Sequence, residues 1–240
     1  MSDLSQVTAV ILAGGLGTRL RKVITNRPKV LAEINGKPFL YYLFDQLTAA
    51  GIKKLIVSTG YMAEKIDEIV GSSYKSLQVS YSREKIPLGT GGALKLAGQA
   101  VTTKYCLVMN GDSYTDFDFD SLLINHLKLD DSIIIVVKSV EDSSRYGNIH
   151  MDEQNNILKF TEKGGTPNWG LINTGVYLMS TSVLQEIPEK IPCSLEYDFF
   201  PSMIGQGICG YKTEGRFIDI GTPESYAQAE YFFELKLISV

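Results

Sequence analysis

Short runs of consecutive apolar residues mark the first 140 residues of the chain. Rich in β-branched and aromatic side chains, they cover Val7–Leu12, Leu55–Ser58, Leu77–Tyr81, Cys106–Met109 and Ile133–Val137. Strands buried on both faces have this continuous apolar character, whereas half-exposed strands alternate apolar and polar residues. The pattern therefore predicts strands of a sheet that is covered on both sides.

Segments with helical patterning alternate with these strands. Phe39–Ala50 and Met62–Val70 each end before a glycine, a common helix terminator. A further helix is expected after Gly92, and another over Ser121–Lys128 with Asp120 as its N-cap. Strands and helices in alternation predict an α/β fold with a doubly wound, mostly parallel central sheet of the Rossmann-like type.

The pattern changes after about residue 140. Strands with shorter or absent crossovers are predicted, and they cover Gly147–Met151, Ile157–Phe160, Val176–Met179 and Ile208–Thr213. They indicate a mixed-sheet extension that forms the second half of a cleft. Pro223–Ile238 begins with a proline, which suits a first helical turn, and predicts a closing helix. We expect one domain over residues 1–240, with halves at about 1–140 and 141–222 and a C-terminal helix at 223–238.

A glycine-rich loop follows the first strand. It has the sequence Ala13-Gly14-Gly15-Leu16-Gly17-Thr18-Arg19-Leu20, and Pro28-Lys29 comes shortly afterwards. Glycines allow successive N–H groups to point into one concavity, and an arginine adds a fork that grips phosphate. A strand-exit turn without a ligand would gain little from Arg19. The loop therefore predicts binding of a nucleoside triphosphate.

Two better-known phosphate loops are excluded. A P-loop needs a lysine directly after its last glycine, and none stands there. A dinucleotide fingerprint needs a third glycine at the position of Leu20. The loop is thus of another kind.

The loop with its downstream Pro-Lys pair resembles the signature of the sugar-1-phosphate nucleotidyltransferases, also called nucleotide-sugar pyrophosphorylases. Further segments resemble motifs of the same family, and the resemblance extends over nearly the whole chain. These segments are Leu88–Ala93, Asn110-Gly111-Asp112, Phe160–Lys163, Asn173-Thr174-Gly175 and Phe217–Pro223. The resemblance implies an enzyme that joins a nucleoside triphosphate to a sugar 1-phosphate and releases pyrophosphate.

The family pattern, carried over position by position, implies roles for individual residues. Arg19, Lys29 and Asp112 would be catalytic, and Asp112 with Asp219 would hold Mg²⁺, which prefers oxygen ligands. The nucleotide would be bound by Leu12, Ala13, Gly14, Gly15, Gly17, Thr18, Arg19, Lys29, Gly89, Thr90 and Gly111. The sugar phosphate would be bound by Gly147, Glu162, Lys163, Asn173, Gly175 and Glu196.

Structural alternatives remain open for several of these residues. Asp112 also suits a turn, Glu162-Lys163 an exposed pair before two glycines, and Leu88–Ala93 a flexible helix start. Glu196 equally suits the N-cap of a helix over Tyr197–Ile204.

Within the family, the segments Leu88–Ala93 and Phe217–Glu224 resemble most the D-glycero-α-D-manno-heptose 1-phosphate guanylyltransferases. This implies GTP as the triphosphate and a heptose 1-phosphate as the acceptor. The alternatives are a mannose-1-phosphate guanylyltransferase and a hexose or muramate 1-phosphate thymidylyl- or uridylyltransferase. A nucleotide-sensing subunit without activity would be expected to lack one of the charged groups Arg19, Lys29, Asp112, Lys163 and Asp219, all of which are present.

Composition limits the partners. The 23 basic and 27 acidic side chains give a net charge of −4, without the basic excess that a nucleic-acid partner requires. Three cysteines follow no metal or redox spacing, and neither a signal peptide nor an apolar run of membrane-spanning length is visible. We expect a cytoplasmic enzyme with no nucleic-acid or membrane partner, which forms a homo-oligomer if it assembles at all.

Overall fold

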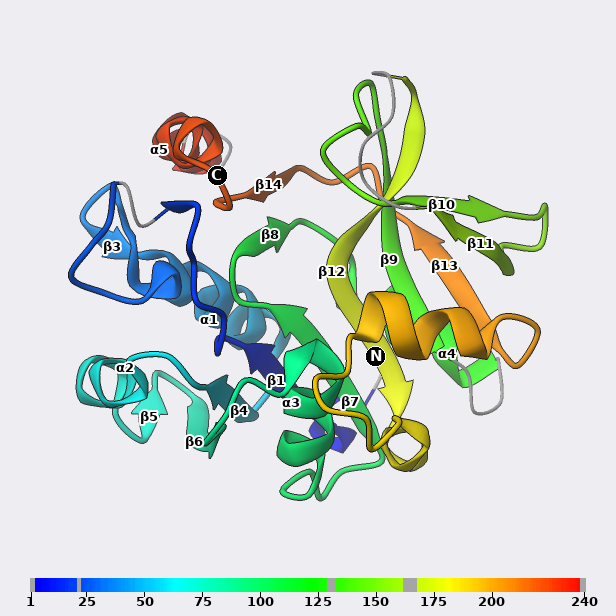
Figure 1. Cartoon of the computed structure of the whole chain (residues 1–240), viewed down its shortest axis with the longest axis horizontal. Helices are drawn as coiled ribbons and strands as arrows, with labels where there is room; N and C mark the ends of the chain where they lie inside the picture. Colours follow the sequence, from blue (N-terminus) through cyan, green and yellow to red (C-terminus); the bar gives the residue numbers. More distant parts are fainter. Residues whose placement is uncertain (1–2, 21–22, 129–132, 162–167, 238–240) are drawn as a thin grey trace.

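The computed structural model describes residues 3–20, 23–128, 133–161 and 168–237. Four parallel strands lie side by side at the centre in the order β7, β1, β4, β6. Their bounds are β1 Val7–Leu12, β4 Lys54–Thr59, β6 Leu77–Arg83 and β7 Tyr105–Asn110. Four of the five predicted apolar runs lie within these strands, which confirms a parallel sheet at the centre of an α/β fold (Figure 1). The fifth, Ile133–Val137, lies instead in β9 Ile133–Val140, which belongs to the mixed part of the sheet.

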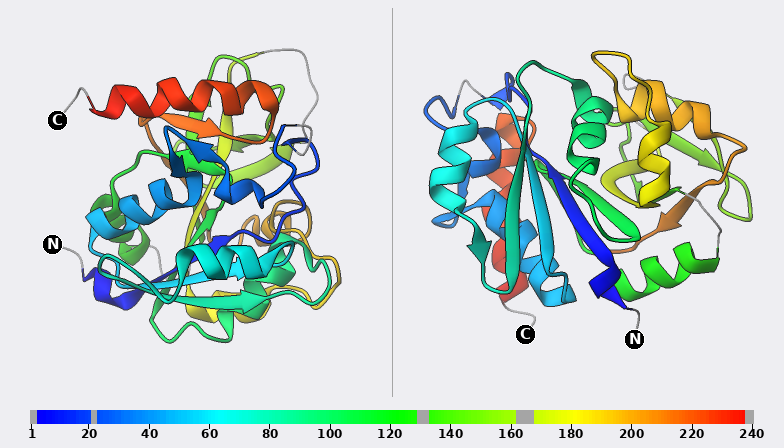
Figure 2. Two further views of the ribbon diagram at one scale, coloured as in Figure 1. Left: turned by 90° about the vertical axis from the view of Figure 1, so that its left-hand side faces the viewer. Right: turned by 90° about the horizontal axis from the view of Figure 1, so that it is seen from below.

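Helices cover this sheet on both faces, as its doubly apolar strands require (Figure 2). In β1, Ala9 and Ile11 pack into one core cluster and Val10 into the other. The first cluster includes α1 Phe39–Ala50, α2 Ala63–Val70, α4 Phe119–Lys128 and α5 Pro223–Leu237. The second includes α3 Gly89–Gly98 and the short helices η4 Thr181–Glu186, η5 Leu195–Phe199 and η6 Phe200–Met203.

The mixed extension begins at β12. Its second half pairs antiparallel with β7, and its first half pairs antiparallel with β10, while β9 runs along its other side. The bounds are β9 Ile133–Val140, β10 Asn148–Met151, β11 Ile157–Thr161, β12 Gly170–Ser180 and β13 Ile208–Lys212. Together with β5 Ser73–Tyr74 these strands complete a 10-stranded sheet. The predicted change to mixed pairing after residue 140 is confirmed.

Two small strand pairs lie off this sheet and were not predicted. β2 Glu33–Ile34 pairs with β3 Lys37–Pro38, and β8 Ser113–Thr115 pairs with β14 Phe217–Asp219. Runs of two or three residues carry no periodicity by which a sequence could reveal them. The remaining short elements are the 3₁₀-helices η1 Leu4–Gln6 and η3 Lys29–Leu31.

Two helix starts differ from the prediction. α4 begins at Phe119, and the carboxylate of Asp118 accepts the Ser121 N–H at 3.0 Å, so the expected Asp120 cap is wrong. α3 begins at Gly89, so the glycines expected before this helix form its first turn. In the described part of the chain, no helix combines the length and apolar character needed to cross a bilayer.

β12 changes partners at a bulge. Its register with β9 shifts between Asn173 and Tyr177, and Gly175 in that interval has φ +81°. A bulge of this kind bends the strand and redirects side chains. A Cβ on Gly175 would lie 2.6 Å from Asn110 Nδ2 and 2.8 Å from Ser113 Oγ. The bulge therefore packs directly against the end of β7, where only glycine fits.

Replacing Gly175 by alanine should destabilise the fold by about 2–5 kcal/mol, the sum of left-handed backbone strain and overpacking. Gly205→Ala is the matched control, because Gly205 has φ +78° with nothing within 4 Å of its added Cβ. That variant should lose only about 1–2 kcal/mol. Urea unfolding of both proteins measures the difference, and equal losses would contradict the close packing of the bulge.

Candidate active site

The glycine-rich loop leaves the sheet between two neighbouring strands. Ala13 N–H donates to Ser58 O at 2.8 Å, and Gly111 N–H donates to Leu12 O at 2.9 Å. A Cβ on Gly17 would lie 3.1 Å from Lys29 Cβ, and Leu20 is buried beneath the loop. Lys29 thus lies against the loop, and Leu20 packs into the core.

A cleft of ≈ 590 Å³ opens over this loop. Its size suits a nucleotide-sized ligand, and it lies at the carboxyl ends of the parallel strands, where α/β folds bind ligands. Ten of the eleven predicted nucleotide residues line it, namely Leu12, Ala13, Gly14, Gly15, Gly17, Thr18, Arg19, Lys29, Gly89 and Thr90. The eleventh, Gly111, lies below the loop, where a Cβ would approach Leu12 O to 2.8 Å.

The predicted charged groups converge beside Gly221, which also lines the cleft. A Cβ on Gly221 would lie 2.6 Å from Asp219 Oδ1, 3.5 Å from Lys29 Nζ and 3.8 Å from Arg19 Nη2. Lys29 Nζ also donates to Asp112 Oδ2 at 2.6 Å. Four of the five predicted groups thus surround one small space. The fifth, Lys163, lies outside the described residues, as does Glu162.

The β8–β14 pair brings the two aspartates together across a long stretch of sequence. Asp112 follows the end of β7, and β8 begins at the next residue. In the pair, Asp219 stands opposite Ser113, and Ile220 N–H donates to Asp112 O at 2.9 Å. Two backbone segments more than one hundred residues apart are thereby held in register at the mouth of the cleft.

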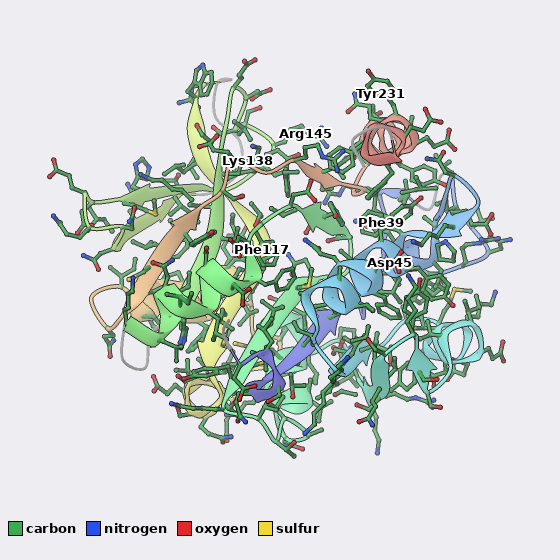
Figure 3. All side chains as sticks on the ribbon, turned by 180° about the vertical axis from the view of Figure 1, so that it is seen from behind. Phe39, Asp45, Phe117, Lys138, Arg145 and Tyr231 are labelled. Atoms are coloured by element: carbon green, nitrogen blue, oxygen red, sulfur yellow. The ribbon has the colours of Figure 1, made fainter. Side chains whose placement is uncertain are left out.

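Tyr146 and Arg145 fix the carboxylate of Asp219. Tyr146 OH donates to Oδ2 at 2.6 Å, Arg145 Nη2 lies 3.6 Å from the same oxygen, and Gly221 N–H donates to Oδ1 at 2.8 Å. Figure 3 shows Arg145 beside β14. Burial, and then the hydrogen bond to Asp219, raise the pKa of Tyr146, so the phenol stays a neutral donor. Neither contact was predicted.

The pair Asp112 and Asp219 has the chemistry of a magnesium site. Carboxylate oxygens are the ligands that Mg²⁺ prefers, and this ion usually combines one or two of them with water and substrate phosphates. Each carboxylate oxygen has lone pairs beyond the hydrogen bonds given above. Within the described residues no group of three or more His, Cys, Asp or Glu side chains could hold a metal. The two residues therefore fit a metal that is shared with a phosphate ligand.

Two of the predicted sugar residues, Glu196 and Asn173, belong to a hydrogen-bond network behind the cleft. Thr90 Oγ1 donates to Glu196 Oε2 at 2.9 Å, Tyr177 OH donates to Glu196 Oε1 at 3.3 Å, and Asn173 Nδ2 donates to Tyr177 OH at 3.0 Å. Burial and the Glu196 charge raise the pKa of Tyr177. This network connects a cleft-lining residue to the bulge of β12. Among the described cleft-lining residues, Gly147, Asn173, Gly175 and Glu196 do not appear.

Glu196 is not the helix cap that the sequence left open. Ser194 Oγ accepts the Tyr197 N–H at 3.2 Å, and η5 begins at Leu195. Gly147 immediately precedes β10, where a Cβ would lie 3.1 Å from Thr161 O.

Glu84 is a cleft residue that the sequence analysis missed. It follows the end of β6, is partly buried, and accepts the Leu88 N–H at 2.8 Å through Oε2. Burial raises the pKa of this carboxyl, although the Leu88 hydrogen bond opposes the shift. Its place at the carboxyl end of a parallel strand was a signal that could have identified it.

Thr90→Val should destabilise the protein by about 1–3 kcal/mol, because Thr90 Oγ1 accepts the Leu195 N–H at 2.9 Å and its loss leaves that donor unpaired. Thr102→Val is the control, since exposed Thr102 accepts a hydrogen bond only from Lys54 among the described residues. Chemical denaturation compares the two. If both variants unfold like the parent protein, the Thr90 hydroxyl has no structural role.

Comparison with known proteins agrees with this geometry. The Nucleotidyl transferase family matches residues 8–235. The chain is 36% identical over 225 residues to the D-glycero-alpha-D-manno-heptose 1-phosphate guanylyltransferase of Aneurinibacillus thermoaerophilus, a match that covers 92% of this chain and 96% of the relative. It is 38% identical over 221 residues to the protein of the same name from Campylobacter jejuni, with 91% and 96% covered.

A solved relative has the same fold. The crystal structure of HddC from Yersinia pseudotuberculosis matches with a TM-score of 0.84 and 36% sequence identity, and the match covers 94% of this chain and 99% of that one. The same protein complexed with GMP-PN matches with a TM-score of 0.82. These matches confirm the family and the enzyme class that the motifs predicted: the chain belongs to the nucleotidyl transferase family.

Proposed function

We propose that this chain transfers a guanylyl group from GTP to D-glycero-α-D-manno-heptose 1-phosphate and releases pyrophosphate. The observation that supports this most is the convergence of Arg19, Lys29 and Asp219 around Gly221, with Asp112 bonded to Lys29. The names of the two relatives at 36% and 38% identity support the sugar and the base. The complex of HddC with GMP-PN supports a guanine nucleotide.

The proposed reaction brings two polyanions together. An oxygen of the sugar 1-phosphate forms a bond to the α-phosphorus of GTP, and the bond from that phosphorus to the pyrophosphate oxygen breaks. Like unit charges 4 Å apart repel by about 4 kcal/mol at an effective dielectric of 20. Cations and alignment therefore supply most of the catalysis in such a transfer.

Each converging residue has a proposed part in this reaction. The loop N–H groups and Arg19 hold the triphosphate, and Lys29 neutralises charge that grows on its oxygens during transfer. Asp112 and Asp219 would hold Mg²⁺, which screens the repulsion between the two phosphates when it is bound. Tyr146 keeps the Asp219 carboxylate in one orientation through its 2.6 Å hydrogen bond.

The two parts of the chain divide the substrates between them. We assign the nucleotide to the half at about 1–140, whose loop and strand ends line the cleft. The sugar phosphate belongs to the half at about 141–222, with Gly147, Glu162, Lys163, Asn173, Gly175 and Glu196 as its candidate residues. Both halves form one catalytic domain, and α5 is its last element.

A matrix of substrates tests the proposal. Four nucleoside triphosphates are combined with a panel of heptose, mannose, glucose and muramate 1-phosphates, and pyrophosphate release is measured with and without EDTA. We expect the fastest release from GTP with the heptose 1-phosphate, and none in EDTA. If no combination released pyrophosphate, the proposed activity would be refuted. If another sugar 1-phosphate gave faster release, that sugar would be the acceptor in place of the heptose.

Asp112→Asn should lower kcat by about 100-fold or more while GTP still binds, because asparagine removes one of the two carboxylate charges that would hold Mg²⁺ and so weakens transition-state stabilisation. Asp3→Asn is the control, since Asp3 caps η1 and asparagine caps equally well. Stopped-time assays and isothermal titration with GTP give the two quantities. Undiminished turnover would remove Asp112 from the catalytic site.

Lys163→Ala should raise KM for the sugar 1-phosphate by about tenfold, the effect of losing one charge-assisted hydrogen bond, and leave the GTP dissociation constant unchanged. Lys159→Ala serves as the control, because it removes a lysine from β11, the strand that precedes Lys163 in the sequence. The proposed role is contradicted if the variant loses affinity for GTP and keeps its KM for the sugar phosphate.

A further inference from the structure

β8 and β14 form a pair of strands that lies apart from the 10-stranded sheet (Figure 1). Three residue pairs join them, from Ser113 opposite Asp219 to Thr115 opposite Phe217. A two-stranded ladder is only marginally stable by itself, and these strands are far apart in the chain and share no connecting turn. Interactions outside the ladder must therefore hold it closed.

One end of the ladder carries Asp112 and Asp219, and the other end carries an ion pair. There Arg216 Nε donates to Asp116 Oδ2 at 2.9 Å, and Asp116 N–H donates to Arg216 O at 2.9 Å. The same two residues are thus joined through their side chains and through their backbones. Asp116 comes four residues after Asp112. At a rise of about 3.4 Å per residue, the ion pair lies about 14 Å along the strand from the aspartate that begins it.

Asp116 is held by three further neighbours. Tyr114 OH donates to Oδ1 at 2.9 Å, and Thr213 Oγ1 donates to the Asp116 backbone oxygen at 2.9 Å. Gly215 lies so close to this oxygen that an added Cβ would overlap it. Burial, and then the Asp116 charge, raise the pKa of the Tyr114 hydroxyl, so it stays a neutral donor. The Asp116 carboxylate therefore has a fixed position.

Arg216 joins the ladder to the C-terminal helix. Its Nη1 donates to Phe232 O in α5 at 3.0 Å, and its guanidinium carbon lies 4.7 Å from the centre of the Phe232 ring. The Arg216 and Asp116 side chains are 35% and 33% exposed, so water screens their attraction only in part. A planar guanidinium can bind two acceptors at once, which a lysine ammonium does less well. Arg216 thus holds β14 between β8 and α5.

We infer that Asp116 and Arg216 are positioning residues of the proposed metal site. Their ion pair holds β8 against β14, and the ladder in turn fixes the spacing of the Asp112 and Asp219 carboxylates. Neither Asp116 nor Arg216 is among the described residues that line the cleft, so both act through the backbone. At the metal end that backbone is joined by the hydrogen bond from Ile220 N–H to Asp112 O.

This inference rests on the proposed function, and it names a determinant of the metal affinity of that site. Mg²⁺ requires nearly ideal octahedral geometry. A ladder that opens more easily holds the two carboxylates less precisely, so the enzyme should need a higher concentration of Mg²⁺.

Asp116→Asn breaks the ion pair with the smallest change in shape. The amide oxygen can still accept the Tyr114 hydroxyl, but the NH₂ group then faces the Arg216 guanidinium, and two donors cannot pair. We expect the Mg²⁺ concentration for half-maximal activity to rise by about tenfold, the effect of losing one hydrogen bond to a charged group, and excess Mg²⁺ to restore kcat. The GTP dissociation constant in EDTA should keep the parent value. Arg216→Lys, which keeps the charge but cannot reach both acceptors, should cause a smaller rise.

Hydrogen exchange in the metal-free protein tests the inference without turnover. In Asp116→Asn the Ile220 N–H should exchange about tenfold faster relative to the Val10 N–H in the central strand β1, because the ladder opens locally. A general loss of stability would speed both amides and leave their ratio unchanged. Asp45→Asn is the matched control, since Asp45 is 32% exposed and also binds a lysine and a tyrosine. It should change neither the exchange ratio nor the Mg²⁺ requirement.

The outcomes separate this inference from the proposed function. If the enzyme is active but Asp116→Asn keeps the parent Mg²⁺ requirement or the parent exchange ratio, the inference is wrong and the activity stands. A loss of kcat that excess Mg²⁺ does not restore also overturns it. If Asp116→Asn does not fold, Arg216→Lys undergoes both measurements under the same criteria. If the parent enzyme releases no pyrophosphate, the proposed function fails, and an unchanged exchange ratio would then refute the role of the ion pair.

Discussion

The charge of Lys29 is the constraint on which the site depends. Its side chain is only 11% exposed, and an ammonium withdrawn from water needs an opposite charge close by. Asp112 supplies that charge at 2.6 Å, yet keeps 44% of its own side chain exposed toward the cleft. The pair is therefore stable without substrate and still open to it. In the proposed reaction a phosphate at Lys29 would share the ammonium with Asp112, and the carboxylate would retain lone pairs for a cation.

Close backbone approaches make this arrangement possible. Three glycines stand where chain segments converge: Gly111 beneath the loop, Gly175 at the bulge of β12 and Gly221 after β14. At each of them an added Cβ would come within 2.8 Å of a neighbouring atom. A larger residue would push the segments apart, and the charged groups with them. The positions of the charged side chains thus depend on glycines, which carry no charge but leave enough space for the chain segments to pack closely.

The sequence predicted the elements that burial determines, and it did not predict the features that depend on local backbone geometry. Strands buried on both faces left continuous apolar runs, and α1 has the predicted bounds because Gly51 ends it in the left-handed conformation. β8 and β14 are too short for a pattern, so the register that brings Asp112 to Asp219 was invisible. Asp118 caps α4, and Asp120 lies in its first turn. Both are aspartates at the start of the helix, and only the backbone geometry distinguishes them. Glu84 stands in no motif that was recognised, although it follows a predicted strand, and the structure shows it against Gly14 of the loop.

The network behind the cleft explains why the two halves of the site form a unit. Glu196 accepts hydrogen bonds from Thr90 at the start of α3 and from Tyr177 in β12, and Tyr177 accepts one from Asn173 at the bulge. Tyr177 is fully buried, so its hydroxyl cannot exchange these partners for water, and a broken bond there leaves an unpaired polar group. A shift of α3 therefore strains β12. The position of the cleft wall and that of the bulge are consequently fixed by one set of hydrogen bonds, which joins the start of α3 to the part of β12 that carries Asn173 and Gly175.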